Sequence, residues 1–153
     1  MTKNFLFPVF KSYITAIILF TIFFTTFAFG GERRSISAPI ANVRSGPGDN
    51  HKILWKLEKY HPIQITESSG EWYQFTDFEG DKGWIHKSVI SDVPSVIIKK
   101  DNCNVRSGPG ENNKTIFRVG RGVPFKVLER KGKWIYIQHS DGDKGWISES
   151  LVW

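Results

Sequence analysis

Apolar and polar residues alternate in short runs over most of the chain, and clusters of turn residues separate these runs. The runs are rich in β-branched and aromatic residues, a composition typical of β-strands. The clusters SSGE and FEGDKG between them favour turns. No long stretch keeps the apolar spacing of a helix. We therefore predict an all-β chain with strands ILWKL, PIQITES, EWYQFTD and KGWIHKS, and later TIFRV, PFKVLER, KWIYIQH and KGWISES.

This pattern occurs twice, at an offset of 62 residues. The heptapeptide NVRSGPG begins at Asn42 and again at Asn104. The hexapeptide GDKGWI begins at Gly80 and again at Gly142. From the first heptapeptide onward the copies align without a gap. A fixed period of this kind indicates one structural unit written twice.

The repeat divides the chain after its N-terminal segment into two domains. We assign the first to residues 35–91 and the second to residues 97–153, with only DVPSV between them. Strands this short cannot bury both faces of a flat sheet, so each unit is expected to curl into a small barrel. The short joint predicts restricted motion between the units.

The first thirty residues differ from the rest. Lys3 and Lys11 give a positive start, and no charged residue occurs from Ser12 to Gly31. A positive region, an apolar stretch and small residues before a cut are typical of a secretory signal, so we predict a signal peptide over residues 1–30. The alternative is an uncleaved anchor, because the apolar stretch is nearly long enough to span a bilayer. Both interpretations place the remaining chain outside the cytoplasm, and we expect the periplasm.

The heptapeptide predicts an ordered turn. Pro47 fixes its own φ and biases Gly46 toward extended backbone, while the glycines allow conformations closed to other residues. The segment GPGENNKT at 108–115 imitates a phosphate-binding loop, but Asn113 replaces the glycine required before the lysine. No strand-then-helix pattern surrounds it, which argues against that interpretation.

The combination of NVRSGPG, a following G-x-W and GDKGWI resembles the bacterial SH3 domain, or SH3b, family. The resemblance covers both units. It implies two tandem small SH3-like β-barrels, with the heptapeptide leading into the long loop called RT. Members of this family are commonly attached to cell-wall hydrolases and are thought to bind peptidoglycan or its stem peptides.

The resemblance also suggests where a ligand would bind. Period two in EWYQF and KWIYI directs Tyr73 and Phe75, and likewise Ile135 and Ile137, toward the core. The opposite face, beside the RT loop, resembles the family's ligand groove, where an exposed tryptophan suits sugar rings or peptides. The alternative is that Trp72 packs under the loop and fixes it. The candidate ligand-binding residues are Arg44, Trp72, Trp84, Arg106, Trp134, Tyr136 and Trp146.

The two arginines of the repeated heptapeptide have two possible roles. Arg44 and Arg106 carry guanidinium forks that suit a stem-peptide carboxylate. Alternatively, each pairs with an acid of its own unit, such as Asp81 or Asp143.

Catalytic chemistry has little support in the sequence. Cys103 is the sole cysteine and aligns with Ala41, so we expect a buried core thiol. The four histidines show no metal-ligand spacing. We predict no catalytic residues, no metal and no cofactor, and therefore a non-enzymatic protein.

Charge separates the two units. The chain has a formal net charge of +6, and most of the excess of lysine and arginine lies in the second unit. An anionic envelope polymer or membrane surface suits this charge, although a solvated face explains it equally well. Export argues against nucleic acid as a partner. We expect the protein to bind peptidoglycan, or alternatively to act as an interaction adaptor for another envelope protein, and to touch the membrane only through an uncleaved N-terminal segment.

Overall fold

The computed structural model describes residues 31–153. Residues 1–30, with the predicted signal or anchor segment, lie outside the described residues. From residue 31 onward, thirteen strands and two short 3-10 helices form two separate sheets. None of the helices in this part of the chain has the length and apolar character needed to cross a bilayer.

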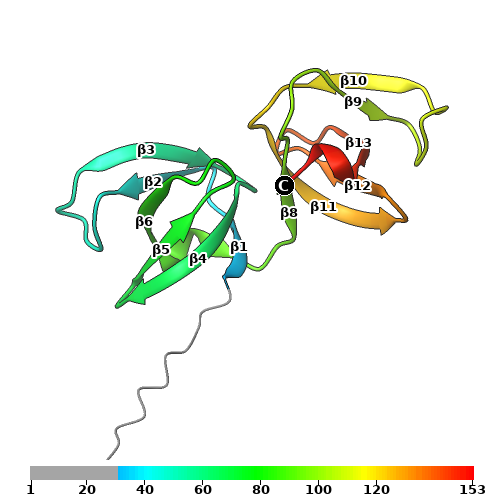
Figure 1. Cartoon of the computed structure of the whole chain (residues 1–153). Coiled ribbons are helices and arrows are strands. Elements are labelled where there is room, and N and C mark those ends of the chain that lie inside the picture. Colours follow the sequence, from blue (N-terminus) through cyan, green and yellow to red (C-terminus); the bar gives the residue numbers. More distant parts are fainter. Residues whose placement is uncertain (1–30) are drawn as a thin grey trace, which may run out of the picture.

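The first sheet curls around one core (Figure 1). Its strand order is β3-β2-β6-β5-β4-β1-β7, and all of its neighbours are antiparallel. A one-turn 3-10 helix, η1, follows β6. The bounds are β1 Glu32–Ile36, β2 Ile40–Arg44, β3 Ile53–Glu58, β4 Pro62–Ser69, β5 Trp72–Thr76, β6 Lys82–His86, η1 Lys87–Val89 and β7 Ile90–Ser91.

The second sheet repeats this arrangement with the order β10-β9-β13-β12-β11-β8. The pair Ile36–Ile90 in the first sheet corresponds to the isolated bridge Ile98–Val152 in the second. The prediction of an all-β chain with two tandem small barrels is confirmed. The bounds are β8 Ser95–Ile97, β9 Cys103–Arg106, β10 Thr115–Val119, β11 Pro124–Lys131, β12 Trp134–Gln138, β13 Lys144–Ser148 and η2 Glu149–Leu151.

Each barrel has its own apolar core, filled by alternate residues of its strands. Phe75 and Ile63 are fully buried in the first core. At the equivalent positions the second core has Ile137 and Phe125, so the large ring moves from one strand to its neighbour. Each core therefore contains one phenylalanine and one isoleucine at these two positions, so the total side-chain volume is the same although the two residues have changed places.

Register shifts explain several apolar side chains on the surface. On β3, Trp55 pairs with Val43 and Ile53 with Arg44, which leaves Leu54 without a partner on β2. The same shift recurs on β10 at Ile116. An extra residue of this kind bends the strand and turns its side chain outward, and both side chains are exposed.

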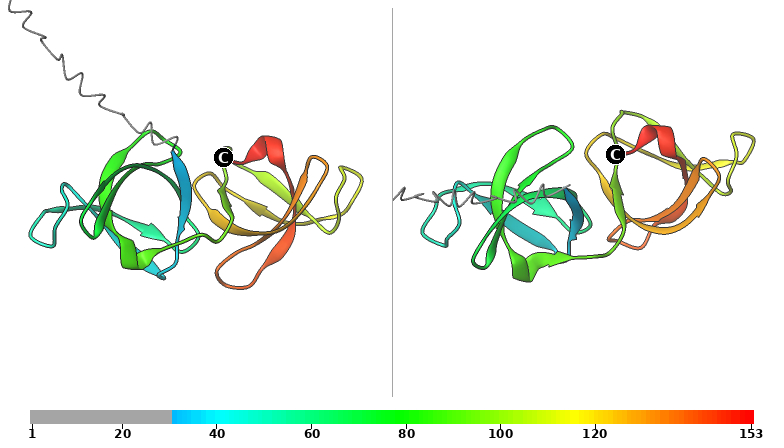
Figure 2. Two further views of the ribbon diagram at one scale, coloured as in Figure 1. Left: turned by 90° about the horizontal axis from the view of Figure 1, so that it is seen from below. Right: turned by 60° about the horizontal axis from the view of Figure 1, so that its bottom comes forward.

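The segment between the barrels is bonded to both of them. The Ser35 hydroxyl donates to the carbonyl of Val93 at 2.8 Å, and the Val127 amide donates to the carbonyl of Pro94 at 2.8 Å. Arg121 of the second barrel pairs with Glu79 of the first at 2.5 Å. The barrels lie side by side around this joint (Figure 2).

Candidate functional site

The arginine of each NVRSGPG motif braces the loop that follows it. Arg44 donates from Nη1 to the carbonyl oxygens of Asp49 and His51, both at 2.9 Å. Arg106 donates from Nη1 to the carbonyl of Asn113 at 2.9 Å. The bond to the residue seven positions ahead recurs in both units, from Arg44 to His51 and from Arg106 to Asn113. Hydrogen bonds from a charged donor to backbone carbonyls hold the loop in one conformation.

This geometry corrects one sequence-based interpretation. Arg44 and Arg106 do not pair with Asp81 and Asp143. The acid near Arg44 is Asp49, whose Oδ1 lies 3.4 Å from Nη2. The arginines select partners five to nine residues ahead because β2 and β9 lead directly into the loops that they hold.

One glycine in each loop packs closely against a side chain of the same loop. A Cβ atom on Gly46 would lie 2.5 Å from Cε1 of His51, and one on Gly108 would lie 2.7 Å from Oδ1 of Asn113. Each glycine therefore lets the loop fold back on itself. Together with the arginine hydrogen bonds, this packing holds the loop in a defined conformation.

A row of side chains crosses the outer face of each sheet. In the first barrel Arg44 stands opposite Trp84, which stands opposite Gln74. The corresponding row of the second barrel is more aromatic. Arg106, Trp146 and Tyr136 occupy the matching positions, and the two rings stack with centroids 5.1 Å apart at 27°.

Trp72 and Trp134, the tryptophans expected to be exposed for ligand binding, lie in different surroundings. Trp72 is only 9% exposed and meets the His86 ring edge-on at 5.1 Å. Its expected exposure is therefore wrong, and the packed alternative describes it. Trp134 is half-buried, and Ser148 stands opposite it where the first barrel has His86. The smaller partner leaves the indole face of Trp134 more open.

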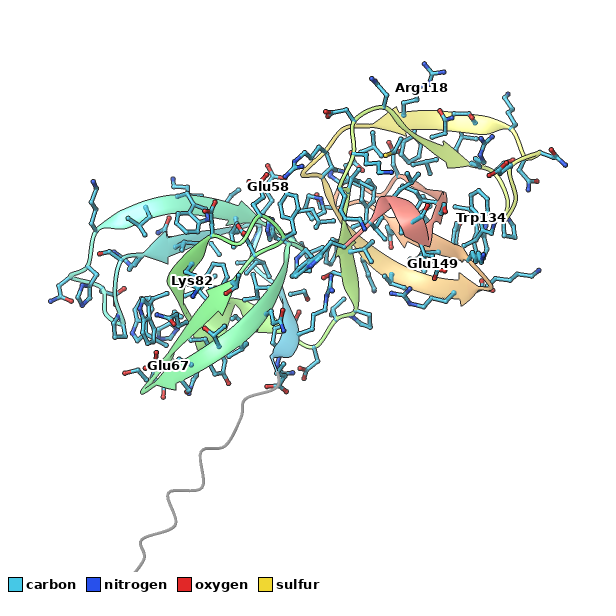
Figure 3. The ribbon with its side chains drawn as sticks, viewed as in Figure 1. Glu58, Glu67, Lys82, Arg118, Trp134 and Glu149 are labelled. Carbon is cyan, nitrogen blue, oxygen red and sulfur yellow. The ribbon has the colours of Figure 1, made fainter. Side chains whose placement is uncertain are left out.

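A groove of about 320 Å³ lies beside Trp134 in the second barrel. It runs between the RT loop, η2 and the turn that precedes β9. Figure 3 labels Trp134 at this side of the barrel. Both charge signs line it together with several hydroxyl and amide groups. The residues that matter here are Lys100, Asp101, Arg106, Glu111, Trp134 and Ser150.

Two of the predicted site residues, Arg106 and Trp134, line this groove together. Tyr136 and Trp146 lie in the outer row instead. The sequence did not single out Asp101 or Glu111, which come from the loops before and after β9 and line the same groove. The sequence alone gives no signal for these two acids, because only the folded chain places their loops beside the same groove.

Cys103 forms part of the groove floor but belongs to the core. Its side chain is buried, as predicted, and Sγ donates to the carbonyl of Lys100 at 3.1 Å. Burial raises the pKa of this thiol, which favours the unreactive protonated form. Within residues 31–153 no three His, Cys, Asp or Glu side chains are grouped to hold a metal ion.

Several curated proteins are similar to this chain. The putative N-acetylmuramoyl-L-alanine amidase YrvJ of Bacillus subtilis is 29% identical over 154 residues, covering 91% of this chain and 29% of that protein. The probable cell wall amidase LytH of Staphylococcus epidermidis is 39% identical over 49 residues, covering 31% and 17%. The probable endopeptidase p60 of Listeria monocytogenes is 28% identical over 91 residues, covering 54% and 19%. The chain spans less than a third of the length of these relatives.

An NlpC/P60 family protein from Bacillus cereus is one of the solved structures that the comparison found. It has a TM-score of 0.39 and 12% identity, covering 80% of this chain and 56% of that one. The family model for the bacterial SH3 domain matches residues 37–92 and again residues 99–153. This chain belongs to the bacterial SH3 domain family, and it carries two tandem copies of that domain.

Proposed function

We propose that this chain is a non-enzymatic binding protein of the cell envelope that holds peptidoglycan, through its stem peptide or its glycan. The observation that carries the proposal is the groove of the second barrel, which Trp134 and Arg106 both line beside a loop held by Arg106. The relatives named as cell-wall amidases and an endopeptidase support a wall ligand. Because the chain matches only part of each relative, we propose for it the binding of the cell wall and not its hydrolysis.

The groove's chemistry suits a peptide that carries charges of both signs. Lys100 and Arg106 offer donors to carboxylates, and Asp101 and Glu111 offer acceptors to amines. Trp134 adds a flat apolar surface on which a sugar ring or a peptide segment can lie. A wall stem peptide attached to glycan presents all of these features.

We assign the stronger binding to the second barrel. In the first barrel His86 packs edge-on against Trp72, and the tryptophan is nearly buried. Arg44 bonds two carbonyls of its own loop and also pairs with the Asp49 carboxylate, whereas Arg106 has no carboxylate within 4.0 Å in residues 31–153. The first barrel would then contribute through the outer row at Trp84, or mainly by supporting its partner.

We propose an envelope location, in the periplasm. The support is the composition of residues 1–30, which predicts a signal peptide or, alternatively, a membrane anchor. Cleavage is tested by N-terminal sequencing of the mature protein. A mature chain that begins at Gly31 supports the signal, and an intact Met1 supports the anchor.

The binding proposal is tested by sedimentation with isolated sacculi. The full-length protein, purified in a mild detergent, is expected to pellet with sacculi at low salt. Trp134→Ala is expected to reduce the bound fraction several-fold, and Tyr60→Ala, in a turn of the first barrel, serves as the aromatic control. Protein that remains in the supernatant rules out wall binding.

An interaction adaptor is the second candidate, favoured by the stacked pair Tyr136–Trp146 on the outer face. A pull-down from envelope extracts separates it from wall binding. A stoichiometric protein partner that is lost in Trp146→Ala but kept in Trp134→Ala supports the adaptor. Release of soluble wall fragments that persists in Cys103→Ala with a chelator present would overturn the non-enzymatic assignment.

A further inference from the structure

A cavity of about 520 Å³ lies at the joint between the two barrels, away from the groove of the second barrel. The first barrel contributes β1, and the second contributes β11, η2 and its last residue. In Figure 1 the C-terminal end lies beside β8 at this joint. The residues that carry the argument are Arg33, Arg34, Asp92, Arg130, Glu149 and Trp153.

Arg33 crosses the joint to stack on Trp153. Its guanidinium carbon lies 4.0 Å from the centroid of the indole. Stacking uses the flat face of the guanidinium and leaves its in-plane N–H donors available for an oxyanion. Within residues 31–153, no carboxylate lies within 4.0 Å of Arg33.

Arg130 brings a second guanidinium to the same cavity from the other barrel. It also has no carboxylate within 4.0 Å in the described part of the chain. Burial, and after it the positive charge of Arg130, lowers the pKa of Arg33. Both side chains are exposed, so solvent screens much of the repulsion between their like charges, and an anion bound between them would lower it further.

The other charged side chains of the cavity differ in whether they have an ion-pair partner. Arg34 is paired with both Glu32 and Asp92, so these charges are satisfied locally. Glu149 lines the cavity, and no lysine or arginine of residues 31–153 lies within 4.0 Å of it. Its negative charge would repel a bound anion. Removing that charge should therefore tighten anion binding, whereas removing an arginine should weaken it.

We propose that the joint is a second binding site, for a small oxyanion carried by a carboxylate or a phosphate group, held jointly by Arg33 and Arg130. The cavity is of ligand size, and guanidinium forks match both oxyanions bidentately. Peptide carboxylates and phosphate-containing polymers share this chemistry. Since the two arginines come from different barrels, a bound anion also fixes the barrels to each other.

The test follows the Trp153 indole N–H by NMR in the full-length protein at low salt. One sample is titrated with inorganic phosphate and another with N-acetyl-D-alanine. At least one probe is expected to give a saturable shift, and the probe that does so identifies the anion class. Arg130→Gln, which leaves the Arg33–Trp153 contact intact, is expected to weaken the apparent Kd about tenfold.

Three further variants complete the design. Arg33→Gln is expected to weaken binding to a similar extent, whereas Arg118→Gln, an arginine on β10 that does not line the cavity, is expected to have no effect. Glu149→Gln is expected to tighten binding about two- to threefold, because it removes a repelling charge. No saturable shift with either probe, or equal affinity in Arg130→Gln and the parent, overturns the proposal. Sacculus binding of the same variants depends on the Trp134 groove, so the two proposals fail independently.

Discussion

Arg106 and Asn113 are joined by a hydrogen bond of 2.9 Å, from the guanidinium Nη1 to the backbone carbonyl, across the base of the RT loop. Arg44 makes the same bond to His51 in the first barrel. The loop's shape therefore depends on a side chain at the end of the preceding strand.

Replacing Arg106 with alanine is expected to lower the free energy of unfolding by about 1–2 kcal/mol, since a charged donor to a part-buried carbonyl is lost. Urea denaturation measures the change, and hydrogen exchange should show faster exchange at residues 107–114. Arg118→Ala, whose bond to Asn104 is exposed, should change stability by less than about 0.5 kcal/mol. Equal effects of the two substitutions would refute the bracing role.

The two equivalent tryptophans should separate stability from binding. Trp72→Ala is expected to cost about 3 kcal/mol of unfolding free energy, because a nearly buried indole leaves a cavity. Trp134→Ala should cost about 1 kcal/mol, because its indole is already part-exposed. Urea denaturation and sacculus sedimentation on the same samples check both effects. A larger stability loss in Trp134→Ala than in Trp72→Ala would contradict this assignment.

His61 should make the protein sensitive to acid. The ring is 8% exposed, its Nε2 has no hydrogen-bond partner, and burial lowers its pKa to about 4, with Glu79 acting weakly in the opposite direction. The unfolded chain binds a proton near pH 6.5 and the folded chain does not until about pH 4, so stability rises with pH across this window. The neutral form of His61 therefore adds about 3 kcal/mol to the free energy of unfolding above pH 6.5, and this stabilisation is lost as the pH falls to about 4.

Replacing His61 with leucine should therefore flatten the stability curve between pH 6.5 and 4. Urea denaturation at several pH values provides the measurement. His51→Gln, at an exposed histidine of the RT loop, is the control and should keep the parent's slope. A slope unchanged by His61→Leu would show that other groups cause the acid sensitivity.

The contact between Glu79 and Arg121 should govern motion between the barrels more than their stability. The pair is exposed, so Glu79→Gln is expected to change the unfolding free energy by less than about 1 kcal/mol. Arg121 also lies over the Phe78 ring at 5.3 Å, which holds the second barrel against the first. NMR relaxation should report more independent tumbling of the barrels in the variant. The exchanged pair Glu79→Arg with Arg121→Glu should restore joint tumbling in part, because it restores the ion pair but not the contact with the Phe78 ring. A failure of both effects would exclude this contact as a link between the barrels.

The repeat made most of the fold predictable. Strand composition indicated an all-β chain, and the gapless offset transferred each landmark of one barrel to the other. The buried positions Phe75, Ile135 and Ile137 followed from the period of two.

The candidate site was less predictable because it depends on pairing across strands. The different exposures of Trp72 and Trp134 arise from His86 and Ser148, which lie opposite them only once the register is fixed. The partners of Arg44 are backbone carbonyls, which no residue type reveals. The cavity at the joint depends on how two separate units dock, and the sequence of neither unit contains that information.

The exchanged positions of phenylalanine and isoleucine in the two cores have a consequence for the folding pathway. Two nearly identical units on one chain risk exchanging strands while both are incomplete. A barrel that took β4 from the first unit and β12 from the second would combine Ile63 with Ile137 and leave a void, and the opposite mixture would crowd Phe75 against Phe125. Both hybrids are less stable than the correct barrels. We therefore expect each unit to select its own strands during refolding, despite the repeated surface motifs that the units share.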